Sequence, residues 1–293
     1  MRGLLFPSAG FSLLLTVALA ALPVSVPAAG ATIDHSKITE VVNSVSIITP
    51  KTLAAAPARQ SEMFRSPDIM KTGPQSRSEM VADDQTITRV GANTLFSFEP
   101  RQRVIDLKQG SVLFQSPHGM GGGEIKTDSA TASVLGTTII VVATRDGGFK
   151  LLVLEGTGYV KMPNGKHTIL HGGQLVYIPP GGKDIGPILN FRLSEEVKSG
   201  RLVDGFHRPL PSWPKIVAQI QKQEAEIASG QFQNGGMVIG NSADPNTTIN
   251  HIQSLHLTVP LAAPGPAASL PVPQPTPAGK RGGGGTTTPG GKP

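Results

Sequence analysis

Short runs of aliphatic and β-branched residues recur through the middle of the chain, between residues 38 and 190. Glycine, proline, asparagine and aspartate separate the runs, and this spacing is typical of many short β-strands in a sandwich, roll or barrel. The predicted strands are Val41–Ile48, Ser78–Val81, Thr86–Val90, Thr94–Phe98, Val104–Leu107, Val112–Gln115, Ala132–Thr144, Phe149–Leu154, Gly158–Met162, His167–Leu170 and Gln174–Ile178. The pattern therefore predicts an all-β fold.

Two turn sequences predict β-hairpins within this region. Asn164-Gly165 lies between two predicted strands, and both positions of such a turn favour a positive φ. Asp146-Gly147-Gly148 is a second turn of this kind. Each pair of flanking strands is expected to be antiparallel.

An internal repeat indicates how the hairpins are arranged. Residues 91–98 lead to Leu107–Phe114, and about 45 residues later residues 136–142 lead to Leu154–Val160, with a shorter echo at Leu170–Tyr177. Each unit consists of a strand, a tight glycine turn and a strand, and we expect the units to stack into a β-roll or sandwich. We expect structural turns, with the left-handed backbone that glycine permits, at six positions. They are Gly73, Gly91, Gly110, Gly136, Gly156 and Gly173.

Residues 1–30 have the pattern of a secretory signal peptide. Phe11–Leu22 is a 12-residue apolar run, too short to span a bilayer comfortably, and small residues suited to cleavage follow it. An uncleaved anchor helix is the alternative, which the prolines around the run disfavour. We expect an exported protein, periplasmic or extracellular, with no membrane span after signal cleavage.

The C-terminal part has a different character. Residues 191–259 are expected to form a helical flank to the β region of residues 31–190, with an amphipathic helix over 213–229 that Ser212 caps and Gly230 ends. We expect this helix to pack on the β domain, with partner binding as the alternative. In residues 260–293, 17 of 34 residues are Pro or Gly, a composition typical of disorder.

Charge and cysteine content exclude several classes of function. The formal net charge is +6, but three of the basic residues lie in the C-terminal tail, and no cluster of Lys and Arg with stacking aromatics occurs elsewhere. Nucleic-acid binding is therefore not expected. The chain has no cysteine, which excludes disulfides, thiolate catalysis and cysteine metal sites.

Six segments, in order along the chain, resemble the FecR domain, the periplasmic part of FecR-type iron-transport regulators. They cover about residues 65–180 and are Thr72–Met80, Ile87–Thr94, Leu107–Gly110, Thr127–Thr137, Val153–Gly156 and Gly173-Gln174. The resemblance implies an all-β domain with no catalytic residues. Regulators of this family also have a cytoplasmic anti-sigma arm, and with about ten residues before the apolar run we expect no such arm here. We therefore do not expect the family's signalling mechanism to carry over to this chain.

Candidate chemical sites are few. His167 and His171 lie four apart, roughly 13 Å on a strand, which is too far to share a metal. The segment Gly173–Asp184 is similar to the second cupin motif, with Asp184 in place of the ligand histidine, so we expect no metal site and no cofactor. Arg77 and Arg89 are the candidate binding residues: they could form an anion site, or a cross-strand salt bridge with Glu79 or Asp83.

Three hypotheses of function follow. The first is an exported, non-enzymatic FecR-like domain that acts as an envelope scaffold or recognition module and binds an envelope protein or polymer. The second is a domain that senses a ligand or a receptor within a transport or signalling system. The third, a cupin-like enzyme, fits the sequence least well. The sequence does not determine the partner, the oligomeric state or a part in sigma-factor signalling.

Overall fold

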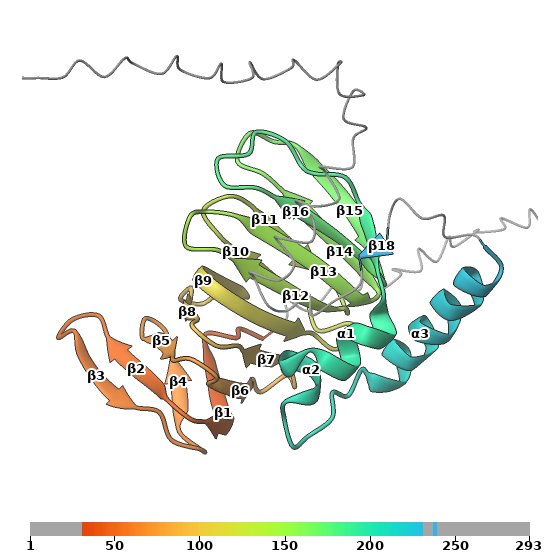
Figure 1. The fold of residues 1–293 in the computed structure, drawn as a ribbon. Helices are drawn as coiled ribbons and strands as arrows, with labels where there is room; N and C mark the ends of the chain where they lie inside the picture. The colour runs from red at the N-terminus through yellow and green to blue at the C-terminus, as the bar shows by residue number, and fades with distance from the viewer. Residues whose placement is uncertain (1–30, 231–236, 239–293) are drawn as a thin grey trace, which may run out of the picture.

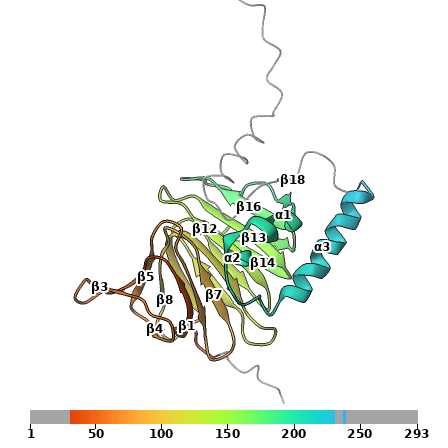
Figure 2. The ribbon, with the colours of Figure 1, turned by 60° about the horizontal axis from the view of Figure 1, so that its bottom comes forward.

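The computed structural model describes residues 31–230 and Met237–Val238. The chain is mostly β, as predicted, and folds into two packed β layers with a helical layer on one side (Figures 1 and 2). The predicted signal peptide, the tail of residues 260–293 and most of residues 231–259 lie outside the described residues.

The first β layer, sheet A, is antiparallel except for its last pair of strands. In spatial order it contains β4 (Met63–Arg65), β1 (His35–Val42), β6 (Arg77–Val81), β7 (Ile87–Val90), β9 (Val104–Gln115), β12 (Thr138–Ala143), β13 (Phe149–Glu155), β16 (Gln174–Ile178), β17 (Leu189–Phe191) and β18 (Met237–Val238).

The second layer, sheet B, packs on one face of sheet A. It contains β3 (Ala54–Pro57), β2 (Val45–Thr49), β5 (Ile69–Thr72), β8 (Leu95–Phe98), β9, β10 (Gly123–Lys126), β11 (Thr131–Val134), β14 (Thr157–Lys161) and β15 (His167–His171). The β9–β10 pair is parallel and the other pairs are antiparallel.

Strand β9 belongs to both layers. Residues 105–109 pair with β8 in sheet B, whereas residues 112–115 pair with β7 in sheet A. Gly110 lies at the change of layer with φ +94°, where a Cβ would approach Thr94 Oγ1 to 2.2 Å. Glycine is needed here both for the backbone conformation and for the close approach.

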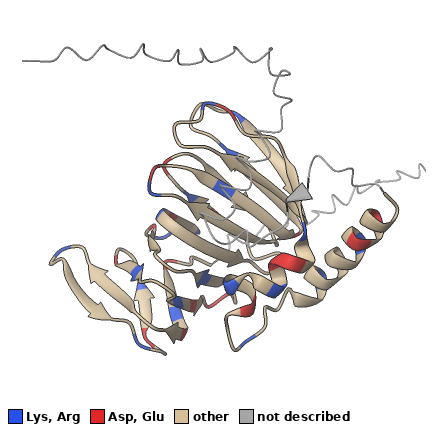
Figure 3. Cartoon of the chain, in the orientation of Figure 1, with Lys and Arg blue, Asp and Glu red and all other residues tan. Residues whose placement is uncertain are grey.

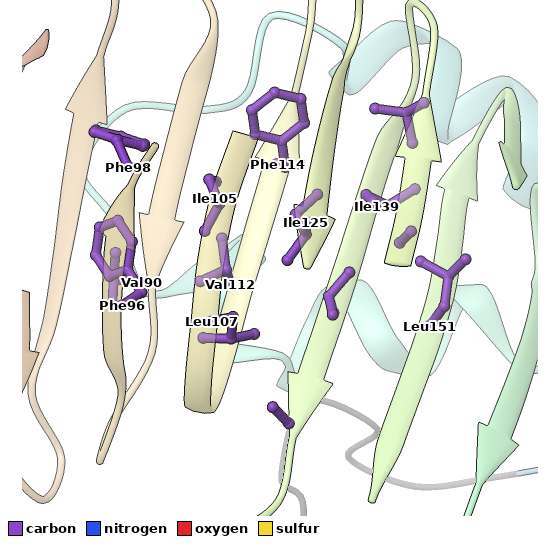
Figure 4. Close-up of a cluster of buried hydrophobic side chains, with 14 of the residues drawn as sticks. Val90, Phe96, Phe98, Ile105, Leu107, Val112, Phe114, Ile125, Ile139 and Leu151 are labelled. Atoms are coloured by element: carbon purple, nitrogen blue, oxygen red, sulfur yellow. The ribbon is translucent and has the colours of Figure 1, made fainter. Parts of the chain in front are cut away.

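The central strands β12 and β13 of sheet A are buried on both faces, so they are largely apolar rather than alternating. Ile139 and Val141 of β12 belong to the core between the two sheets, part of which Figure 4 shows. Ile140 and Val142 belong to a second core beneath the helices. These helices are α1 (Leu193–Ser199), α2 (Arg201–Asp204) and α3 (Trp213–Ala228).

The internal repeat corresponds to a recurring hydrogen-bond arrangement at the layer changes. Thr94 Oγ1 accepts a hydrogen bond from the backbone N–H of Ser111 at 3.0 Å. In the second unit Thr137 Oγ1 accepts one from the backbone N–H of Thr157 at 3.3 Å and donates to its carbonyl at 3.0 Å. The repeated threonine and glycine of each unit therefore hold a strand as it passes from one sheet to the other.

Several local predictions were wrong in detail. The predicted strand Ala132–Thr144 is two strands, β11 and β12, and the predicted strands Val104–Leu107 and Val112–Gln115 are a single strand, β9. The predicted strand Val41–Ile48 is two strands, because Asn43 adopts φ +59° and sends β1 into sheet A and β2 into sheet B. The Asn164-Gly165 hairpin forms, but of these two residues Gly165 is the one with a positive φ. The predicted helix over 213–229 forms as α3, but Ser212 makes no side-chain cap and instead contacts Thr138.

No helix within the described residues is long and apolar enough to cross a membrane.

Candidate functional site

Two charged side chains are buried beneath the helical layer. Arg89 of β7 and Glu79 of β6 are direct cross-strand neighbours, and both are essentially fully buried. Arg89 Nε donates to Glu79 Oε2 at 2.8 Å. This is the cross-strand salt bridge that the sequence offered as one of two roles for Arg89.

Arg89 also holds α2 and the segment that follows it. Its Nη1 donates to the carbonyls of Leu202 at 3.1 Å and Val203 at 2.9 Å, and its Nη2 donates to the carbonyl of Arg208. The ring of Phe206 stacks on the guanidinium, 4.5 Å from its centre. All three nitrogens of the guanidinium therefore bind groups of the protein itself.

Burial and ion pairing have opposite effects on the pKa of Arg89. Removal from water lowers the pKa of Arg89, and the Glu79 carboxylate acts against that shift by stabilising the charged form. A guanidinium keeps its proton in proteins, so the network contains a real buried charge pair. The hydroxyl of Thr39 donates to the other Glu79 oxygen at 2.8 Å, which leaves both carboxylate oxygens bonded.

Arg77 acts on the same segment from the neighbouring strand. Its Nε donates to the carbonyl of Gly205, and its guanidinium lies 5.7 Å from the Phe206 ring centre. The last carbonyls of a helix have no partner within the helix, and arginine side chains commonly satisfy them. The structure thus brings both sequence candidates, Arg77 and Arg89, together around the end of α2. We call the two arginines, Glu79 and Phe206 the arginine latch.

A second polar contact fixes the start of α3. Thr138 Oγ1 lies 2.8 Å from Glu155 Oε1 and 2.7 Å from Ser212 Oγ. All three side chains are buried. Polar bonds beside β7 and beside β12 therefore help to hold the flank to sheet A.

The six turn glycines fall into two groups. Gly110, Gly136, Gly156 and Gly173 have positive φ, as expected for left-handed turns, whereas Gly73 and Gly91 do not. In the latter two turns the left-handed residues are Gln75 and Asn93, each with φ +53°. Gly91 is needed for space instead, because a Cβ there would lie 2.2 Å from Ser111 Oγ.

The histidines of β15 lie apart from this site. Both His167 and His171 are exposed; the ring of His167 packs against Tyr159, and His171 contacts Thr157. Asp184 forms an ion pair with Lys166. In residues 31–230 there is no group of three His, Asp or Glu side chains that could hold a metal ion.

Sequence reasoning missed most of the latch. Phe206 and the carbonyls of residues 202–208 lie in the four-residue helix α2 and the short stretch after it, which have no apolar periodicity. Glu155 gave no signal beyond its place in a family-like segment. Arg89, beside Val90 in β7, and Glu79, beside Met80 in β6, were the available sign of a buried ion pair.

Residues 68–157 match the family model described as FecR protein. The match includes Arg77, Glu79 and Arg89 of the latch, together with Glu155 at the second contact. The sequence has no match among curated proteins.

Two crystal structures of a candidate anti-sigma factor from Parabacteroides distasonis ATCC 8503 are similar to the chain. The first, at 1.65 Å, is 18% identical with a TM-score of 0.38 and covers 42% of this chain and 59% of that chain. The second, at 2.50 Å, is 16% identical with a TM-score of 0.39 and covers 45% and 64%. The chain thus spans less than two thirds of the length of these proteins.

Proposed function

We propose that the chain, which matches the FecR family model over residues 68–157, serves as a regulatory or sensing module of the bacterial cell envelope, without enzymatic activity. The observation that carries the proposal is the family match over residues 68–157. FecR domains form the periplasmic part of transport regulators, which supports a location in the envelope.

The arginine latch gives such a module a means of response. It joins residues within the family match to a helical flank outside it, and it depends on a few directed bonds to Arg89 and Arg77. A partner that binds the FecR domain can alter the flank by competing with or reinforcing these bonds. The module then acts by recognition, with an envelope protein or polymer as its partner.

Export is part of the proposal and rests on residues 1–30. Their apolar run and the small residues after it support cleavage by a signal peptidase. N-terminal sequencing of the mature protein from an envelope fraction tests this step. A protein recovered from the cytoplasm with residues 1–30 intact would contradict it.

Site-specific crosslinking in intact cells tests the recognition role. Leu135 lies within the family match and is 70% exposed, whereas Leu53 lies outside the match and is 78% exposed. A photo-crosslinking residue at position 135 is expected to capture one envelope component reproducibly, and the matched position 53 is expected to capture none. Equal labelling from both positions, or none from either, would count against a partner bound by the FecR domain.

A groove beside the latch favours a ligand-sensing role as the second candidate. Lys37, Gln60 and Arg208 line it, together with Asp83. Among the ion pairs of the described residues, none involves Lys37 or Arg208, so both charges are available to an anion. Melting curves with small carboxylates and phosphates test this role: a shift that Arg208→Ala abolishes and the surface variant Arg145→Ala retains would support it, and no shift would exclude it.

A further inference from the structure

The two sheets end in four edge strands within the described residues, and three of these strands are protected against pairing with a further strand. In sheet A the edge strands β4 and β18 have three and two residues. In sheet B the edge strand β3 ends in Pro57, which cannot donate a backbone hydrogen bond. Short length and proline are two of the means by which natural proteins protect sheet edges.

The fourth edge strand, β15, has none of these protections. It has five residues, His-Thr-Ile-Leu-His, with no proline and no Lys, Arg, Asp or Glu, so its ribbon is tan throughout in Figure 3. It pairs with β14 in unbroken register, without a bulge. Ile169 at its centre has a side chain that is 52% exposed.

The register shows which backbone groups face outward. Met162 N–H donates to the Lys166 carbonyl at one end of the β14–β15 hairpin, and Gly172 N–H donates to the Gly156 carbonyl at the other. Antiparallel pairs alternate between bonded and non-bonded positions, so Thr168 and Leu170 bond to β14. The N–H and C=O of His167, Ile169 and His171 therefore point away from it. The N–H of His171 already donates to Gln174 Oε1, which leaves Ile169 with both groups free.

The pattern of β15 is the same in both directions. His167 and His171 lie two residues on either side of Ile169, and all three side chains are exposed. A second copy of β15, placed antiparallel about a two-fold axis at Ile169, sets Ile169 against the partner's Ile169 and His167 against the partner's His171. Because β15 has no Lys, Arg, Asp or Glu, this arrangement brings no like formal charges together.

We propose that β15 is a homodimerisation edge at which two copies of the chain join their B sheets into one continuous sheet across a two-fold axis. Such an interface is isologous, so it uses both β15 edges and stops at a dimer. This assembly is independent of the proposed regulatory role.

The test measures the mass of the purified full chain in solution by light scattering. We expect a dimer at concentrations on the order of 100 μM, where a small interface is populated. Ile169→Pro removes the outward N–H without removing any bond to β14, and is expected to give a monomer. Ile169→Lys should do the same by placing two charges at the axis. Leu53→Lys, at an even more exposed apolar residue beside the protected β3 edge, should remain a dimer.

A chemical crosslink provides a second measurement. Because the chain has no cysteine, Ile169→Cys introduces a single thiol, which a short bismaleimide is expected to join to the same residue of the second copy. Leu53→Cys is the matched control and should stay uncrosslinked. A wild-type chain that remains monomeric overturns the proposal. The edge of β15 would then be open to pairing with a strand of another protein. A dimer that survives both Ile169→Pro and Ile169→Lys overturns the proposal as well.

Discussion

Arg89→Met is expected to destabilise the protein strongly and to loosen the helical flank first. The substitution removes the positive partner of a fully buried Glu79 and the donor for the carbonyls of Leu202, Val203 and Arg208. Methionine has a similar length and fills the space, so the loss is electrostatic rather than a cavity. Removal of one partner of a buried ion pair costs about 3–5 kcal/mol.

That cost is measurable in two ways. For a folded region of this size, a loss of 1 kcal/mol lowers Tm by about 2–4 °C, so we expect a fall of about 6–20 °C in thermal unfolding. Hydrogen exchange should show faster exchange in residues 201–208 than in the strands of sheet A. This order is expected because the lost bonds join α2 and the stretch after it to the sheet.

Two further variants make the experiment decisive. Arg89→Met combined with Glu79→Leu should recover a large part of the loss, because an apolar pair avoids the uncompensated buried charge. Arg145→Met, at an exposed arginine, should change the stability by less than about 0.5 kcal/mol. The reasoning would be refuted by an Arg89→Met variant within about 1 kcal/mol of wild type, where a typical single hydrogen bond lies.

Two other predictions concern a turn and a surface histidine. Gly156→Ala should lower the free energy of unfolding by about 1–3 kcal/mol, because a side chain at φ +80° is strained and its Cβ would lie 2.8 Å from Thr137 Oγ1. Urea titration measures this loss. Gly165→Ala, at φ +86° but with no atom within 4 Å of the added Cβ, should lower the free energy of unfolding by less. A larger loss for Gly165→Ala would contradict the argument from steric contact with Thr137. The Asp83 carboxylate raises the pKa of His35 above its ordinary value of 6.5. The stabilisation from this pair is therefore full below that pH and is lost as the pH rises through the raised pKa. His35→Asn should lower Tm at about pH 5 and leave it unchanged at about pH 8, and an equal effect at both would contradict the assignment.

The all-β character and the stacked hairpins could be predicted from the sequence because both depend on local pattern. Clusters of β-branched residues and the turn at Asp146-Gly147-Gly148 specify strands and a hairpin without reference to the rest of the chain. The break at Asn43 was missed because apolar residues continue on both sides of it. A single residue with positive φ leaves little trace in such a run.

The arginine latch could not be predicted because its partners are remote in sequence. Arg89 bonds to carbonyls 113, 114 and 119 residues further along the chain. Backbone carbonyls carry no residue-specific signal, so nothing in residues 202–208 marks them as acceptors. Pattern analysis could identify Arg77 and Arg89 as unusual, and the fold was needed to identify what they bind.

The passage of β9 through both sheets has a consequence for how the protein can be divided. The repeat in the sequence invites the view that each unit is a separable half, as in a tandem duplication. Strand β9 of the first unit pairs with β10 in sheet B and with β12 in sheet A. A cut between the units would therefore take a neighbouring strand from the second unit in both layers, so the two halves are expected to fold together or not at all.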